Sequence, residues 1–249
     1  MFKHQGESRT LQHNLKIASI LSFVAGMVNV AGFLSIKQLT TNVTGHFALF
    51  INEVSDFQIW KGTVFLFYIL SFLFGSFISS FLVETFRNNK KLNVFVIPIL
   101  MEVFILVVIA LFYDFGLLTS TNLIACCLLF AMGVQNSLVT KISNAVVRTT
   151  HLTGLFTDLG IDLSHMFFPT SYPDRKKVIS DIKLKGFIIT FFFSGGIFGG
   201  FLYASLNLKL NTLIIAAILL LYSLIYDDVK YSMKKTKVKI KSKIKSVRG

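Results

Sequence analysis

Long runs of apolar residues with almost no charge dominate this sequence and set the strongest limit on its fold. A helix needs about 20 mainly apolar residues to cross the hydrocarbon core of a membrane. Six windows meet or approach that length: residues 15–36, 62–83, 92–112, 122–139, 186–206 and 210–226. Charged residues make up only 15% of the chain, whereas soluble domains carry about 25%. The sequence therefore excludes a soluble globule and predicts an all-α transmembrane bundle of six spans, forming a single domain over residues 1–229.

The formal net charge of +13 is concentrated near the C-terminus. Residues 230–249 form a Lys-rich tail directly after the last apolar window, and we expect this tail to be disordered and cytoplasmic. Such clusters attract anionic lipid head groups and fix orientation, so the predicted partner is the lipid bilayer and not nucleic acid. With the N-terminus also in the cytoplasm, all Lys and Arg residues except Lys37, Lys61 and Lys209 lie on the inner side, as the positive-inside rule requires.

Two further segments, residues 40–54 and 149–168, are partly apolar. If both crossed the membrane, several basic residues, Arg87 and Arg148 among them, would move to the outer side and weaken the charge asymmetry. We therefore expect each segment to be a short helix that enters the membrane partway or lies along its surface.

The two halves of the chain, residues 15–112 and 120–226, share short motifs in the same order. The matching pairs are residues 26–29 with 133–136, 40–45 with 149–154, 61–62 with 185–186, 74–77 with 198–201, and Asn93 with Asn211. Each half holds three windows, an odd number, so the second half must enter the membrane from the opposite side. The sequence thus predicts two inverted three-helix repeats, a plan common among transporters, each with a short broken or re-entrant helix after its first span.

In such folds the polar site lies near the membrane midplane, where broken helices from the two halves meet. Helix N-termini present free backbone N–H groups and the positive end of a dipole. Thr, Asn and Gly favour helix starts and breaks, so Thr44-Gly45 and Thr153-Gly154 are expected at the starts of the two short helices. Ordinary capped turns at the membrane surface are the alternative. The predicted substrate-binding residues at these starts are Thr41, Asn42, Thr44, Gly45, Thr150, Thr153 and Gly154.

Three amides lie deep in the first and fourth windows: Asn29, Gln135 and Asn136. Asn29 and Asn136 correspond in the repeat. Amides in a membrane interior either hydrogen-bond a polar solute or join neighbouring helices. We include all three among the residues predicted to line the site.

These motifs carry a resemblance. The Thr-x-x-Thr-Gly run of residues 41–45, its extension to an Asp in residues 150–158, the run at 133–136 and the Glu in the third window resemble the YoaK-like family of bacterial integral membrane proteins. This is a domain-of-unknown-function family, and the similarity covers about residues 18–226. It implies a multi-pass protein of the bacterial cytoplasmic (inner) membrane but no substrate. His46 departs from the family, which more often has Asn there, and is expected to alter any substrate contact made by that Asn.

Glu102 lies near the middle of the third window. A charged group at the bilayer centre costs about 2.5–3.5 kcal/mol on insertion scales, so such a residue is a functional candidate. We predict that it couples protons or binds a cation; the alternative is a protonated Glu bonded to a neighbouring helix. Asp158 lies one turn after Thr153-Gly154 and is placed to face the same cavity, so we assign it the same coupling role.

His151, Asp158, Asp162 and His165 share one helical face and are metal-ligand residue types. The same spacing describes the wet face of a surface helix, which we favour, and we interpret Lys141 and Arg148 as determinants of orientation. The leading hypothesis is a transporter or channel for a small polar solute or ion, with no catalytic residue, bound metal or cofactor. A second copy of the chain, in a homo-oligomer, is an optional further partner. The alternatives are a membrane-embedded metal-binding enzyme and a non-transporting scaffold or regulatory protein.

Overall fold

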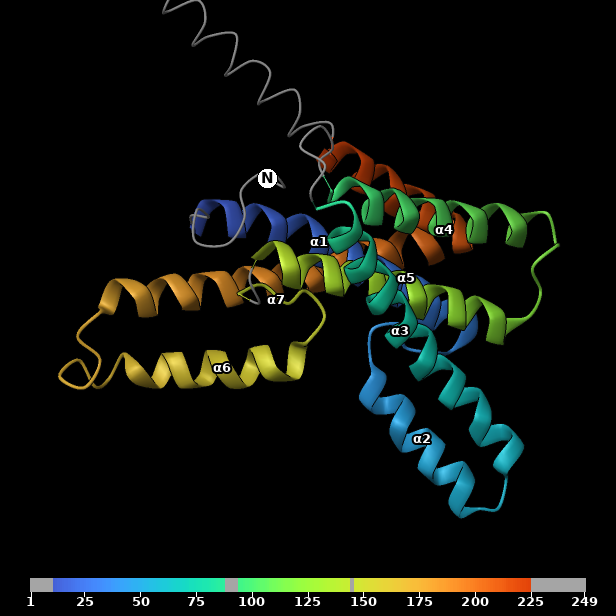
Figure 1. Cartoon of the computed structure of the whole chain (residues 1–249), viewed down its shortest axis with the longest axis horizontal. Helices are drawn as coiled ribbons and strands as arrows, with labels where there is room; N and C mark the ends of the chain where they lie inside the picture. Colours follow the sequence, from blue (N-terminus) through green and yellow to red (C-terminus); the bar gives the residue numbers. More distant parts are fainter. Residues whose placement is uncertain (1–10, 88–93, 144–145, 225–249) are drawn as a thin grey trace, which may run out of the picture.

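The structure is a computed structural model and describes residues 11–87, 94–143 and 146–224 (Figure 1). Over these ranges it is helical, without strands. The elements in order are α1 (Leu11–Ile36), α2 (Val43–Ser55), α3 (Ile59–Thr85), α4 (Val96–Asp114), α5 (Thr121–Ser143), α6 (Leu152–His165), α7 (Arg175–Ala204) and the 3₁₀ turn η2 (Lys209–Asn211). This turn opens a last described helix, Lys209–Leu224. The predicted basic tail lies outside the described residues.

In the part of the chain that the structure describes, five helices are long and apolar enough to cross a membrane: α1, α3, α4, α5 and α7. They coincide with five of the six predicted windows. The sixth window corresponds to the shorter helix Lys209–Leu224, and its last two residues lie outside the described part. α7 has 30 residues and is about 45 Å long. It begins at Arg175, well before the predicted window of residues 186–206.

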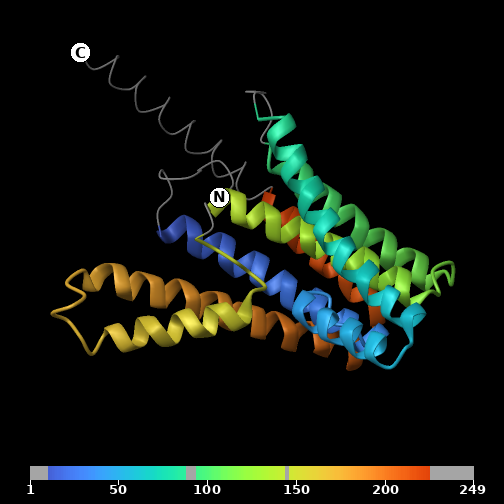
Figure 2. The ribbon, with the colours of Figure 1, turned by 60° about the horizontal axis from the view of Figure 1, so that its bottom comes forward.

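Two short helices, α2 and α6, follow α1 and α5 and confirm the prediction of short helices in these segments. They contain 13 and 14 residues, which gives each a length of about 20 Å. Neither can cross a hydrocarbon core of about 30 Å. In two views their N-terminal ends lie near each other and their C-terminal ends point apart (Figures 1 and 2).

The helices form two close pairs, α1 with α7 and α3 with α5. Glycines allow the close approach, as is usual inside membranes. A Cβ added at Gly26 on α1 would overlap the backbone of Phe192 on α7. A Cβ added at Gly133 on α5 would overlap the backbone of Phe72 on α3 in the same way. Because Gly26 and Gly133 are matching residues of the two halves, the two helix pairs use the same contact.

The glycine contacts correct one part of the sequence alignment. Gly75 packs against Phe130, and Gly195 packs against Phe23. Phe23 and Phe130 lie at matching positions, three residues before Gly26 and Gly133, so the partner of Gly75 is Gly195. The sequence alignment paired Gly75 with Gly199, one helical turn later, and this register is wrong.

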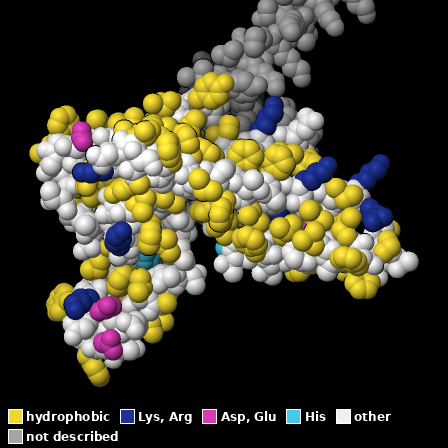
Figure 3. Space-filling view, turned by 180° about the vertical axis from the view of Figure 1, so that it is seen from behind, with side chains coloured by type: hydrophobic (Ala, Val, Ile, Leu, Met, Phe, Trp, Pro, Cys, Tyr) yellow, Lys and Arg dark blue, Asp and Glu magenta, His cyan; other side chains and the backbone are white. Residues whose placement is uncertain are grey.

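α1 and α5 form the centre of the bundle. About 61% of the most apolar segment of each is buried, against 28% for α3 and α7. The outer helices carry exposed aromatic side chains, such as Phe67 and Phe77 on α3 and Phe193 on α7. Apolar side chains cover much of the face seen in Figure 3. Such a surface suits lipid, because a soluble monomer rarely exposes so large an apolar area.

Candidate functional site

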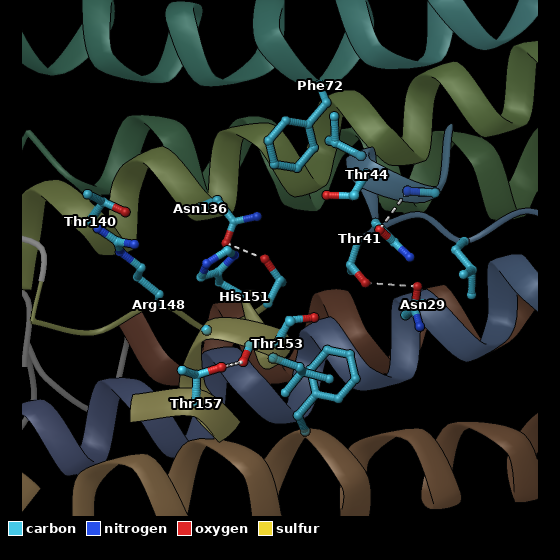
Figure 4. A pocket seen from close by; sticks show the side chains of 18 of the residues that line it. Asn29, Thr41, Thr44, Phe72, Asn136, Thr140, Arg148, His151, Thr153 and Thr157 are labelled. Atoms are coloured by element: carbon cyan, nitrogen blue, oxygen red, sulfur yellow. Dashed lines mark hydrogen bonds between the residues drawn. The ribbon is translucent and has the colours of Figure 1, made fainter. Parts of the chain in front are cut away.

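Two asparagines attach the starts of the short helices to the central helices. The Asn29 side-chain oxygen on α1 accepts hydrogen bonds from the Thr40 backbone N–H at 3.1 Å and the Thr41 hydroxyl at 3.0 Å. The Asn136 side-chain oxygen on α5 accepts a hydrogen bond from the Thr150 hydroxyl at 2.7 Å (Figure 4). The two amides predicted as corresponding residues therefore make corresponding bonds. Each bond joins a central helix, α1 or α5, to the chain segment that leads from it into the next short helix.

The glycine of each Thr-Gly motif lies beside the residue that begins its short helix. Asn42 caps α2, and its side-chain oxygen accepts a hydrogen bond from the Gly45 N–H at 3.0 Å. A Cβ at Gly45 would come within 3.1 Å of the Asn42 amide nitrogen. His151 takes the same position before α6, and a Cβ at Gly154 would overlap its imidazole ring. At Gly154 a Cβ would force the His151 ring to move, whereas at Gly45 the Asn42 side chain would need to shift by only a few tenths of an ångström.

The first turns of α2 and α6 line one cavity of about 1070 Å³. Figure 4 shows their side chains on opposite sides of it, and Figure 3 shows a hollow between the α2–α3 and α6–α7 parts of the surface. Ten of the predicted site residues lie in its wall: Asn29, Thr41, Asn42, Thr44, Gly45, Asn136, Thr150, Thr153, Gly154 and Asp158. The sequence motifs from the two halves thus meet in one place.

Matching positions from the two halves supply most of the remaining wall. Phe72 on α3 and Phe192 on α7 both line the cavity, and so do Ala48 and Thr157. The chemistry of the two sides differs. Leu39 lies on the first side, whereas the corresponding position on the second side is Arg148. The second half therefore gives the cavity its charge.

Arg148, His151 and Asp158 are the ionisable groups of this wall. Within residues 11–87, 94–143 and 146–224, none of these three side chains makes a hydrogen bond or ion pair. All three also line a smaller cavity of about 210 Å³, which is bordered by Asp181 and Lys185 of α7. The side chains of Arg148, His151 and Asp158 thus have no protein partner in the described part of the chain.

Sequence reasoning missed Arg148 because it was counted only as an orientation signal. Its place two residues before Thr150, inside the repeated motif region, was the signal available. Lys141, which the sequence analysis also interpreted as an orientation signal, lies in different surroundings. Its ammonium group pairs with the Glu84 carboxylate at 2.6 Å. Only Arg148 of the two reaches the cavity.

Gln135 and Glu102 lie outside the cavity. The Gln135 amide donates a hydrogen bond to the Leu21 carbonyl at 2.7 Å, and this buried bond joins α5 to α1. Gln135 neighbours Asn136 along the helix, so the two side chains point to different faces. Glu102 on α4 is fully buried, and neither of its oxygens has a hydrogen-bond partner in the described part of the chain.

The predicted polar face of α6 does not gather its residues into one site. Asp162 pairs with Lys185 on α7, and the His165 ring stacks on Tyr172 with centroids 3.7 Å apart. His151 and Asp158 face the cavity instead. Among the described residues, no three His, Cys, Asp or Glu side chains are grouped as metal ligands.

His46 faces away from the cavity, so the expectation that it alters a substrate contact is wrong. Its side chain is 2% exposed, and its Nε2 atom bonds to the Leu39 carbonyl at 2.8 Å. The ring packs against Phe65 and Tyr68, with centroids 6.2 and 5.2 Å away. The Tyr68 hydroxyl in turn donates to the Asn122 side chain at 2.8 Å. His46 therefore belongs to an aromatic cluster that joins α2, α3 and the start of α5.

Comparison with known proteins agrees with this architecture. Residues 17–226 match the family described as protein of unknown function (DUF1275). The chain is 27% identical over 186 residues to the UPF0700 transmembrane protein YoaK of Bacillus subtilis (strain 168), an alignment that covers 73% of this chain and 80% of that protein. No solved structure matches it. With its apolar helices and this transmembrane relative, the chain belongs to the YoaK-like DUF1275 family of membrane proteins.

Proposed function

We propose that the protein moves a small polar solute or ion across the bacterial cytoplasmic membrane and has no enzymatic role. The solute site would be the cavity between two inverted repeats, residues 15–112 and 120–226. In this arrangement Lys209–Leu224 is part of the sixth crossing, and both termini lie in the cytoplasm.

The packing supports an inverted repeat. The pair α1 and α7 and the pair α5 and α3 meet through corresponding glycines, Gly26 and Gly133. Asn29 and Asn136 make corresponding bonds to Thr41 and Thr150. A two-fold axis that exchanges α1 with α5, α2 with α6 and α3 with α7 would generate each contact from its counterpart.

The observation that carries the proposal is the shared cavity wall. The first turns of α2 and α6 line one space of about 1070 Å³, together with Asn29 and Asn136. In transporters built from inverted repeats, broken helices from the two halves meet at the solute site. A metal-binding enzyme would instead need a ligand cluster, but Asp162 and His165 contact Lys185 and Tyr172, while His151 and Asp158 line the cavity.

The two ends of the cavity favour a carrier over a channel. On the α6–α7 side, the cavity borders the smaller space lined by Leu155 and Lys185. The corresponding positions on the α2–α3 side hold His46 and Phe65, which pack with Tyr68. The α6–α7 side thus has an adjoining cavity where the related side is filled by side chains, an asymmetry that suits a protein whose site faces one side of the membrane at a time.

Glu102 is proposed to couple protons to this movement from outside the solute site. Burying an ionised carboxylate without a partner costs several kcal/mol, and Glu102 has no partner among the described residues. The variant Glu102→Gln should bind solute as the native protein does, while uptake should lose its dependence on a pH gradient. An unchanged response to the gradient would remove the coupling role and leave the site intact.

Flux measurements on purified protein in lipid vesicles test the main proposal. Uptake of radiolabelled amino acids, sugars, carboxylates, amines and inorganic ions is compared with that of protein-free vesicles. Thr153→Val, which removes a hydroxyl from the cavity wall, should reduce uptake of the active solute. Thr63→Val is the matched control, because Thr63 lies at the start of α3 and bonds to the Trp60 carbonyl. If no class crosses faster than in protein-free vesicles and none raises the melting temperature, the proposal fails.

A further inference from the structure

We propose that the solute is a small zwitterion, bound by its acidic group at Arg148 and by its ammonium group at Asp158. This inference rests on the proposed function and names the class of solute for the same cavity. It follows from the unequal charge of the two cavity walls.

The charge lies on one side only. Arg148 and Asp158 line the cavity from the second half of the chain. The corresponding residues of the first half are Leu39 and Leu49, which are apolar. The repeated parts of the wall provide hydroxyls, amides and helix starts on both sides. Arg148 and Asp158 are therefore the charged groups that only the second half contributes to the cavity.

Both charges lack a protein partner. Nearby, Asp162 and Lys185 neutralise each other, but the side chains of Arg148 and Asp158 make no ion pair or hydrogen bond in the described part of the chain. A ligand that carries the complementary pair of charges would give each of these two side chains a partner. An Arg guanidinium also presents its N–H groups in a geometry that suits a carboxylate or phosphate.

Solutes with a single charge fit this wall less well. A carboxylate would pair with Arg148 but place its own negative charge in a cavity shared with Asp158. An amine would pair with Asp158 and face Arg148. In either case one of the two exposed protein charges would stay without a partner. A zwitterion satisfies both residues.

The order of the residues along α6 fixes the orientation of the solute. Arg148 precedes the helix and His151 is its cap residue, so the acidic group would lie at the positive end of the helix dipole. Asp158 lies in the second turn, farther from that end. The smaller cavity continues from Arg148, His151 and Asp158 to Asp181, and its mixed charge gives a charged solute a polar route to the site.

Three closely matched compounds test the proposal on the purified full-length protein: alanine, propionate, which lacks the amino group, and ethylamine, which lacks the carboxylate. Dialanine is included because a cavity of about 1070 Å³ has room for a ligand larger than one amino acid. Binding is measured by calorimetry and by the shift in melting temperature. Alanine or dialanine should bind about ten-fold or more tightly than propionate and ethylamine, since each of these leaves one charge unpaired.

Two variants assign the contacts. Arg148→Gln should lose the preference for the zwitterion over ethylamine, and Asp158→Asn should lose the preference over propionate. Arg87→Gln and Asp114→Asn are the controls, because both residues lie outside the cavity walls. Unchanged melting temperatures without solute show that each variant is folded.

The outcomes separate the two proposals. If propionate or ethylamine binds as well as the zwitterions, or if the zwitterions do not bind, the zwitterion assignment is overturned. The proposed function survives either result as long as another solute class from the vesicle panel is transported. Only the absence of transport and binding for every class overturns both.

Discussion

The Asn29 side chain accepts a hydrogen bond from the Thr41 hydroxyl at 3.0 Å, across the turn that joins α1 to α2. The same oxygen accepts from the Thr40 backbone N–H. One amide in a central helix therefore fixes where the next helix starts. Asn136 does the same for the segment before α6 through Thr150.

Replacing Asn29 by Ala should destabilise the protein by about 1–3 kcal/mol, because two hydrogen-bond donors lose their acceptor in a partly buried place. The measurement is the melting temperature of detergent-solubilised protein, with Asn52→Ala, an exposed position on α2, as the control. Asn136→Ala should have a similar but smaller effect, since it removes one bond. Equal melting temperatures for Asn29→Ala and the native protein would show that this amide does not hold the turn.

Gly26→Val should prevent the close approach of α1 and α7. A Cβ at this position would overlap the backbone of Phe192, and a backbone cannot move aside as a side chain can. Forcing extra atoms into a packed interface costs about 1–3 kcal/mol or more. The readout is the yield of monodisperse protein together with its melting temperature.

Gly160→Ala provides the matched comparison for that substitution. An added Cβ at Gly160 on α6 has no atom within 4 Å, and Ala favours a helix over Gly by about 1 kcal/mol. This variant should therefore be as stable as the native protein or slightly more stable. A loss at Gly160 as large as that at Gly26 would mean that glycine packing does not explain the pairing.

The proposed six crossings would place Arg87 and Arg175 on the same face of the membrane and Lys61 on the other. Single-cysteine variants at these positions, made after replacing Cys126 and Cys127 by Ser, can be labelled in intact cells with a reagent that does not cross the membrane. Only Lys61→Cys should be labelled before the cells are opened. Labelling of either arginine position in intact cells would rule out the two inverted repeats.

The aromatic cluster of His46, Phe65 and Tyr68 should control access to the cavity from the α2–α3 side. A cysteine replacing Ala48, which lines the cavity, should react slowly with an impermeant reagent added on that side. Adding Phe65→Ala should speed the reaction, because removal of the ring leaves the cluster incomplete. Phe67→Ala, an exposed ring on the outer face of α3, should leave the rate unchanged.

The sequence predicted the helices and most of the cavity wall because both depend on local patterns. Apolar length identifies a span, and the repeated Thr-Gly motifs mark the starts of α2 and α6. The pairing of Gly75 with Gly195 could not be predicted in this way. Glycines at 195, 196, 199 and 200 recur one turn apart, so two registers fit the sequence equally, and only the contact with Phe23 decides between them.

The side chains that were placed incorrectly depend on which way a helix is turned. Gln135 and Asn136 are adjacent, and only one of them can face the cavity; the bond from Gln135 to Leu21 shows which. His46 follows the Thr-Gly motif but lies on the opposite side of α2 from the cavity. These directions are set by packing against α1 and α3, which a single sequence does not reveal.

The amide bonds at Asn29 and Asn136 have a mechanical consequence. Each holds the starting end of a short helix to the least exposed part of the bundle, whereas the far end continues into α3 or α7 at the periphery. If an outer helix tilts, its short helix must rotate about the amide as a fixed pivot. The end that lines the cavity would then change its angle while keeping its position, so the width of the cavity would vary without displacing the first turn of the helix.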